Sequence, residues 1–124
     1  MEVKEIWKAI PGYEYMYEVS NLGNVKSLSR ENYSGGGMKI SKERILKQHK
    51  NGRGYLKVVL SKNSFKKQIS VHQLVVMAFM GHIPNGKMDL VVDHINDDKL
   101  DNRVENLQVV TQSENIYKSY KKNK

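Results

Sequence analysis

The sequence predicts an α+β protein in which N-terminal antiparallel β-hairpins precede a strand–loop–strand–helix unit. Apolar and polar residues alternate with a period of two around turn residues in the first half of the chain. The apolar spacing then changes to that of a helix after residue 70. With 124 residues, 39% of them hydrophobic, the chain is long enough to bury the core of one domain.

Residues 13–28 predict a first hairpin. Tyr15, Tyr17 and Val19 fall on one face of an alternating strand, and an Asn-Leu-Gly-Asn turn returns the chain. We expect an N-terminal sheet whose core contains the aromatic residues Trp7, Tyr13, Tyr15 and Tyr17.

Residues 55–60 and 65–71 predict a second hairpin, which turns at a Ser-Lys-Asn-Ser segment and carries many basic side chains. The Ser-Gly-Gly-Gly segment at 34–37 lacks the spacing of a phosphate-binding loop or a dinucleotide fingerprint. We interpret it as a flexible connection.

A short helix is predicted from residue 71, ending before Gly81 and Pro84. Its apolar face is formed by Val71, Leu74, Val75, Ala78 and Phe79. His72, at the helix start, is expected to pack or to cap there. Strands at 90–95 and 107–110 then flank a polar loop, and a capping box at 111–114 predicts a final helix to about residue 120.

The net charge of +8 is unevenly distributed along the chain. Residues 26–67 carry twelve basic and two acidic side chains, whereas residues 68–110 carry three basic and six acidic ones. A basic surface of this density suits a polyanion such as nucleic acid, although a solvated lysine-rich surface explains the charge equally well. The candidate DNA contacts are Arg44, Lys47, Lys50, Arg53 and Lys57.

Composition excludes several classes of protein. There is no cysteine, which excludes a disulfide framework and zinc sites built on thiolates. The apolar runs are far shorter than the roughly 20 residues that cross a bilayer, and the charged N-terminus does not resemble a signal peptide. We therefore expect an intracellular, soluble protein.

Polar residues gather in the last third of the chain. Asp93 and His94 end a predicted strand, Asn106 precedes the next strand, and Asn115 lies in the predicted final helix. The strand–loop–strand–helix order can bring these four side chains to one cleft. Adjacent strand residues point to opposite faces, so Asp93 and His94 converge only if the backbone bends there.

Asp93-His94, Asn106-Leu107 and Asn115 resemble the motif of the HNH endonucleases, whose active site is a ββα-metal (His-Me) finger. The stretch from Val71 to Asn115 is similar to the phage and intron-homing branch of that family. Three N-terminal segments resemble a nuclease-associated modular motif that precedes such a finger: 5–8, 11–14 and 17–27. The family name implies a histidine in the third position, where this chain has Asn115.

The resemblance implies a metal-dependent DNA endonuclease. Asp93 and the side-chain oxygen of Asn115 would hold one Mg²⁺ or Mn²⁺, with positions left for water and DNA. His94 would be the general base, since an ordinary histidine pKa of about 6.5 suits proton abstraction near neutral pH. Asn106 would orient the His94 side or brace the finger.

The implied organisation is a basic, β-rich, DNA-binding region at 1–70, a nuclease core at 71–120 and a disordered tail at 121–124. The expected partner is double-stranded DNA, with neither a membrane nor a small-molecule cofactor, and with monomer or homodimer left open. The expected location is the cytoplasm of a bacterial cell or of a phage-infected host.

Two other functions remain open from the sequence. One is a non-catalytic DNA-binding module that retains the finger for stability. The other is an RNA-binding protein, which would stack bases on exposed aromatic side chains of its strands. Residues 39–67 offer few such side chains beyond Tyr55 and Phe65.

Overall fold

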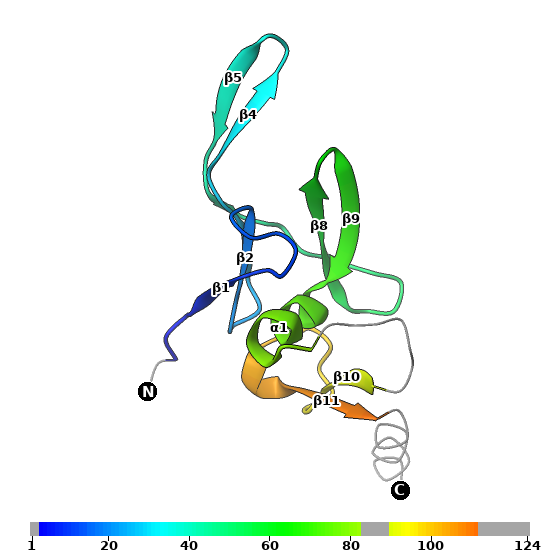
Figure 1. Cartoon of the computed structure of the whole chain (residues 1–124). Helices are drawn as coiled ribbons and strands as arrows, with labels where there is room; N and C mark the ends of the chain where they lie inside the picture. Colours follow the sequence, from blue (N-terminus) through cyan, green and yellow to red (C-terminus); the bar gives the residue numbers. More distant parts are fainter. Residues whose placement is uncertain (1–2, 83–89, 112–124) are drawn as a thin grey trace, which may run out of the picture.

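The computed structural model describes residues 3–82 and 90–111 of the chain (Figure 1). The first sheet has the strand order β1-β2-β3-β6. Its strands are β1 (Trp7–Ala9), β2 (Tyr17–Ser20), β3 (Val25–Ser27) and β6 (Arg44–Ile45). All neighbouring strands in it are antiparallel, which confirms the predicted N-terminal hairpin at β2 and β3.

The prediction for Tyr15 was wrong. Its backbone has a φ of 67°, and its side chain is 89% exposed. Backbone hydrogen bonds from Met16 and Tyr17 to the Tyr13 oxygen close a turn there, so the strand begins only at Tyr17. Tyr17 is 4% exposed, and its hydroxyl oxygen accepts the Ser61 N–H at 3.0 Å.

The glycine-rich segment is the turn of a hairpin and not the flexible connection expected from the sequence. Strands β4 (Arg30–Ser34) and β5 (Gly37–Ser41) pair over five residue pairs. Gly35 and Gly36 between them have φ values of 60° and 82°, a conformation that glycine adopts without strain. Figure 1 shows this ribbon projecting from the rest of the molecule.

A three-stranded antiparallel sheet follows, in the order β7-β8-β9. It contains β7 (His49–Lys50), β8 (Leu56–Lys62) and β9 (Phe65–Ser70), and the last two form the predicted second hairpin. Val58 and Leu60 of β8 are fully buried, whereas Val59 between them is 43% exposed. One face of this sheet therefore packs on the core and the other meets solvent.

Helix α1 (Val71–Met80) begins directly after β9, as predicted, and ends at Gly81, whose φ is 69°. It contacts strands of the first sheet, the β8–β9 hairpin and the C-terminal hairpin, and so lies at the centre of the core (Figure 1). The fully buried core residues are Ile10, Val19, Val25, Val58, Leu60, Val71, Leu74, Val75 and Val76.

The C-terminal hairpin consists of β10 (Leu90–His94) and β11 (Leu107–Thr111), joined by a loop that ends in a short 3₁₀ turn, η1 (Val104–Asn106). The predicted final helix, and Asn115 with it, lies outside the described residues. Among residues 3–82 and 90–111, no helix has the length and apolar character needed to cross a membrane.

Candidate active site

Asp93 and His94 are the last two residues of β10, and both are buried, with 9% and 4% of their surface exposed. Asp93 pairs with Gln108 and His94 with Leu107 in an uninterrupted antiparallel register. No bulge interrupts this register, so the two side chains leave the backbone in opposite directions. Both do so at the same end of β10, next to the loop that leads to β11.

The His94 ring is held by Asn102, a residue that the sequence analysis did not select. Nε2 of His94 lies 2.7 Å from Oδ1 of Asn102, which is itself only 3% exposed. An amide oxygen only accepts, so Nε2 carries a proton and donates it to Asn102. The available signal was an asparagine in the loop eight residues after His94.

Two further rings pack on His94. The centre of its ring lies 5.2 Å from that of His72 on α1 and 5.7 Å from that of Tyr55. Burial, and to a smaller extent the nearby His94, lowers the pKa of His72 to about 4. His72 is therefore neutral at pH 7, and it provides packing next to His94.

Asp93 lies on the other side of the hairpin, where its Oδ2 accepts a hydrogen bond from Nε2 of Gln108 at 2.8 Å. A carboxylate oxygen is a ligand that a hard divalent cation prefers. Within the described part of the chain, no group of three or more histidine and carboxylate side chains is arranged to hold a metal. The Asp93 carboxylate is an oxygen donor of the kind that Mg²⁺ binds, and Mg²⁺ keeps several waters where one or two carboxylates hold it.

Asn106 braces the loop between β10 and β11. Its Nδ2 donates to Asn96 Oδ1 and to the Asp101 oxygen, both at 2.9 Å, and its Oδ1 accepts the Asn96 N–H at 3.1 Å. None of these bonds reaches His94. In the same loop, the side chain of Arg103 donates a hydrogen bond to the Asp101 carboxylate, and this bond lowers the pKa of Asp101 to about 2.

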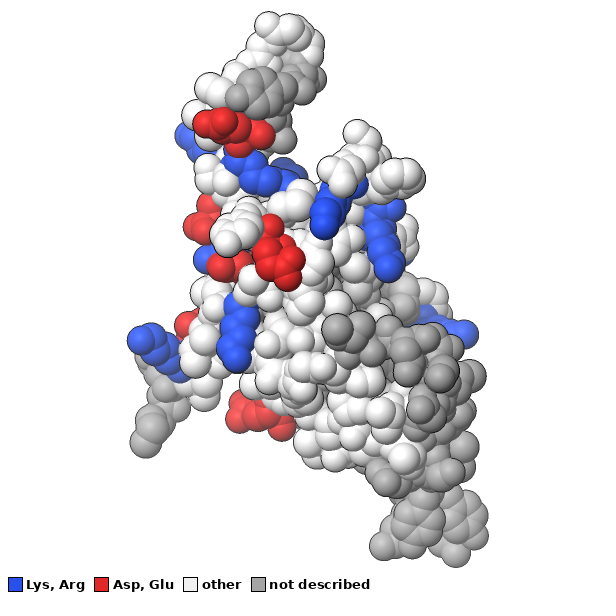
Figure 2. Space-filling model, viewed as in Figure 1, with Lys and Arg blue, Asp and Glu red and all other residues white. Residues whose placement is uncertain are grey.

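The structure distributes the five candidate DNA contacts over two sheets and over the connections on either side of β7. Arg44 lies in β6 of the first sheet, whereas Lys50 and Lys57 lie in β7 and β8 of the second. Four of the five are exposed; Lys57 is half-buried, and its Nζ donates to Gln68 Oε1 at 2.8 Å. On the face shown in Figure 2, Lys and Arg side chains lie over the β8–β9 hairpin, while basic and acidic side chains are mixed over the N-terminal strands.

The turn that carries Arg53 borders the His94 site. The Lys99 ammonium lies 4.8 Å from the centre of the Tyr55 ring, whose other neighbours are His72 and His94. The sequence analysis did not select Lys99, whose basic character is hidden within an acidic segment.

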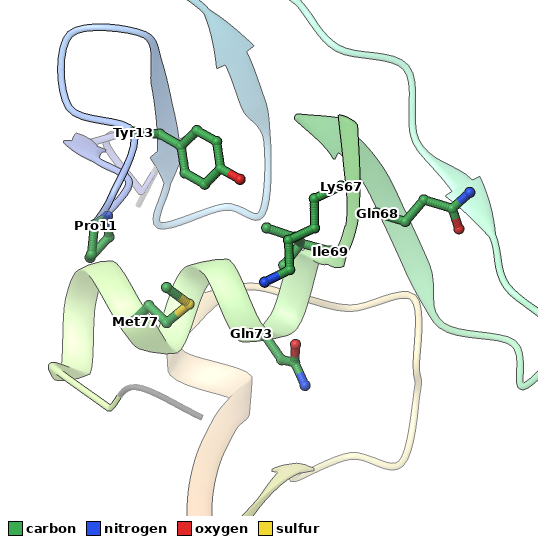
Figure 3. A pocket seen from close by; sticks show the side chains of 7 residues that line it. All are labelled: Pro11, Tyr13, Lys67, Gln68, Ile69, Gln73 and Met77. Atoms are coloured by element: carbon green, nitrogen blue, oxygen red, sulfur yellow. The ribbon is translucent and has the colours of Figure 1, made fainter. Parts of the chain in front are cut away.

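A pocket of about 260 Å³ lies elsewhere on the surface, between the turn after β1, strand β9 and helix α1. Figure 3 shows Tyr13, Lys67 and Met77 around it. None of the described site residues lines this pocket, so it is distinct from the His94 site.

Comparison with known proteins identifies both halves of the chain. Residues 70–117 match the model of an HNH endonuclease family, and residues 5–61 match the NUMOD4 motif. The chain carries an HNH endonuclease domain preceded by a NUMOD4 motif. The match confirms the resemblance found from the sequence, and it shows that the β10–β11 hairpin belongs to the HNH domain.

Two similar proteins are named as endonucleases. The chain is 45% identical over 116 residues to an uncharacterized HNH endonuclease of Acanthamoeba polyphaga mimivirus, covering 90% of this chain and 25% of that protein. It is 39% identical over 110 residues to the DNA endonuclease I-HmuI of Bacillus phage SP01, covering 89% of this chain and 55% of that protein. The chain thus spans about half or less of these curated relatives.

The fold comparison agrees. A solved structure of the HNH homing endonuclease I-HmuI, which concerns DNA binding and cleavage by that protein, matches this chain with a TM-score of 0.75 and 34% identity. The match covers 95% of this chain and 59% of that one. It confirms the predicted α+β fold with N-terminal antiparallel strands.

Proposed function

We propose that this protein is a metal-dependent DNA endonuclease in which His94 takes a proton from the attacking water. The observation that carries the proposal is the buried His94 ring, with its Nε2 at 2.7 Å from Asn102 Oδ1, at the end of β10 in an HNH domain. The ring is fixed by a hydrogen bond and by packing, which a general base requires.

His94 acts through the nitrogen opposite Asn102. With the Nε2 proton directed to Asn102, the lone pair on Nδ1 accepts the proton of a water whose oxygen bonds to phosphorus as the P–O3′ bond breaks. The rings of His72 and Tyr55 limit rotation of the His94 ring. Because burial keeps His72 neutral near pH 7, it places no competing positive charge beside the imidazolium that forms.

Asp93 and Asn115 would hold the divalent cation. Oxygen ligands of this kind suit Mg²⁺ or Mn²⁺, and the small number of protein ligands leaves positions for water and phosphate. When bound, such an ion neutralises charge on the phosphoryl oxygens and stabilises the leaving 3′ oxygen. Gln108 supports this role by donating to Asp93 Oδ2 and fixing the direction of the carboxylate.

Double-stranded DNA would lie along the basic residues of the β6–β8 region, next to the His94 site. Arg53 is exposed, and its turn is joined to Lys99 beside Tyr55, so a phosphate backbone held there passes close to His94. Arg44, Lys47, Lys50 and Lys57 would extend the contact over β6 to β8. We propose accordingly that residues 1–70 contribute DNA binding and that residues 71–120 contribute the chemistry.

Cleavage of supercoiled plasmid DNA tests this function. The full chain is incubated with plasmid and Mg²⁺ or Mn²⁺, with and without EDTA, beside a His94→Ala variant purified identically. We expect nicked or linear product that EDTA abolishes and that His94→Ala reduces by about 10²-fold or more. Binding without cleavage in either metal would instead indicate a non-catalytic DNA-binding module, and preference for single-stranded RNA would indicate an RNA-binding protein.

A further inference from the structure

We propose that the turn between β2 and β3, within the NUMOD4 motif, positions the His94 ring by fixing Asn102. The inference rests on the proposed function and extends it. It gives the N-terminal motif a part in the chemistry in addition to DNA binding. The contacts run from Gly23 in the turn to Asn102, and from Asn102 to His94.

Gly23 approaches Asn102 so closely that a side chain does not fit between them. Its φ is +87°, and a Cβ placed on it would lie 3.0 Å from Asn102 Cβ and 3.1 Å from the Asn102 carbonyl oxygen. Both atoms belong to the rigid part of Asn102, so an added methyl group must displace the residue. The turn therefore sets where Asn102 stands.

The turn is itself fixed from both sides. The Gly23 carbonyl accepts a hydrogen bond from Gln48 Nε2 at 2.8 Å, and the Asn21 side-chain oxygen accepts the Ile6 N–H at 2.7 Å. The Asn21 carbonyl accepts the Val104 N–H at 2.8 Å, which ties the turn directly to the loop that contains Asn102. The turn is thus a rigid support for that loop.

The position of Asn102 in turn determines the position of the His94 ring. It is 3% exposed, and its Oδ1 is the described acceptor for Nε2 of His94. The position of that oxygen determines both the angle of the ring and which nitrogen carries the proton. Gly23 and Asn102 are therefore positioning residues for the proton acceptor.

The chain offers a matched control for this contact. Gly12 has a φ of +88°, yet a Cβ there would meet no atom within 4 Å. Gly12→Ala and Gly23→Ala therefore impose the same backbone strain, and only Gly23→Ala moves Asn102. We expect Gly23→Ala and Asn102→Ala to lower kcat for plasmid cleavage roughly 10- to 100-fold with KM for DNA unchanged. Gly12→Ala should cleave at the wild-type rate, and Asn102→Asp, which keeps an acceptor oxygen, should recover much of the loss.

The ¹⁵N NMR spectrum of the His94 ring tests the same contact without metal or DNA, at a pH well above the ordinary histidine pKa of about 6.5. Wild type and Gly12→Ala should show the tautomer protonated at Nε2, and Gly23→Ala and Asn102→Ala should show a mixture. Gln48→Ala, which removes the bond to the Gly23 carbonyl without adding an atom, should shift the signals in the same direction and replaces Gly23→Ala if that variant does not fold.

Unchanged His94 signals in both Gly23→Ala and Asn102→Ala would overturn the inference, as would a wild-type tautomer protonated at Nδ1. An inactive wild type with the expected spectra would instead refute the proposed function and leave the positioning contact established.

Discussion

Lys99 and Arg53 are 46 residues apart in the sequence, yet the Lys99 ammonium donates a hydrogen bond to the Arg53 backbone oxygen at 2.9 Å. The bond joins the basic turn between β7 and β8 to the loop between β10 and β11. Tyr55, two residues after Arg53, packs on both Lys99 and His94. A surface predicted to bind DNA and a site predicted to cut it are therefore in direct contact.

Replacing His94 tests the proton acceptor. We expect His94→Ala to reduce cleavage about 10²- to 10⁴-fold, the usual contribution of a general base, while DNA affinity stays nearly constant. Plasmid cleavage and filter binding under the same conditions separate the two effects. Wild-type cleavage at neutral pH by a clean His94→Ala preparation would refute the assignment.

Replacing Asp93 tests the metal ligand. Asp93→Ala should abolish cleavage and weaken Mn²⁺ binding, because it removes the described carboxylate at the end of β10. The comparison is Gln108→Ala, which removes the 2.8 Å bond to Asp93 but leaves the carboxylate in place, so it should weaken Mn²⁺ binding less than Asp93→Ala does. Calorimetric titration with Mn²⁺ measures both, and equal affinity in Asp93→Ala and wild type would contradict the role.

Asn106 should act on stability more than on chemistry. It is 6% exposed and makes three hydrogen bonds within its loop, so Asn106→Ala should lower the free energy of unfolding by roughly 1–3 kcal/mol. Asn96→Ala removes only one of the same bonds, the one to Asn96 Oδ1, because the Asn96 backbone N–H remains. That bond is lost at an exposed position, where water replaces it, so this variant should cost less. Urea unfolding compares them. A large loss of cleavage in Asn106→Ala without a loss of stability would point to a direct part in the reaction.

Burial of His72 makes stability dependent on pH. Its pKa falls to about 4 on folding from 6.5, so the unfolded chain binds a proton more readily than the folded one. The neutral His72 ring contributes fully to the free energy of unfolding above pH 6.5. As the pH falls toward 4 that contribution is lost, and the free energy of unfolding declines by up to about 3 kcal/mol. The His72→Phe variant keeps a ring but cannot titrate. Its unfolding free energy should decline less between pH 7 and pH 4.5 than that of wild type, and parallel curves would contradict the prediction.

Local patterns predicted most of the fold. The β8–β9 hairpin and α1 follow from apolar periods of two and 3.6, because each buries one face on a neighbouring element. Tyr15 fits the same alternation but lies in a turn. Backbone hydrogen bonds from Met16 and Tyr17 to the Tyr13 oxygen form this turn before the strand begins. Gly35 and Gly36 were predicted to form a flexible connection because glycine is flexible. Both instead adopt positive φ values, which are those of a tight hairpin turn.

The candidate site was predicted only in part, for a different reason. Asp93, His94 and Asn106 were selected as candidates because they lie in one short motif. Asn102 and His72 were not given a part in the site, because their contacts with His94 arise from tertiary packing. A hydrogen bond and an edge-to-face ring contact of this kind leave no periodic trace in the sequence.

Arg53 provides the test of the DNA surface. It lies in the exposed turn beside Lys99, and if it contacts a phosphate it contributes about −0.9 to the slope of log K against log salt on duplex DNA. Arg53→Ala should therefore flatten that slope by about one unit and weaken binding to all sequences alike.

The matched control for Arg53 is Lys4→Ala, which removes an exposed positive charge outside the strongly basic stretch at 26–67 and should leave the slope unchanged. Fluorescence titrations of the two variants and wild type at several salt concentrations measure the difference. An unchanged slope in Arg53→Ala would mean that this side chain faces solvent in the complex. A loss confined to one DNA sequence would mean that it reads bases, because a phosphate contact carries no sequence information and weakens every duplex equally.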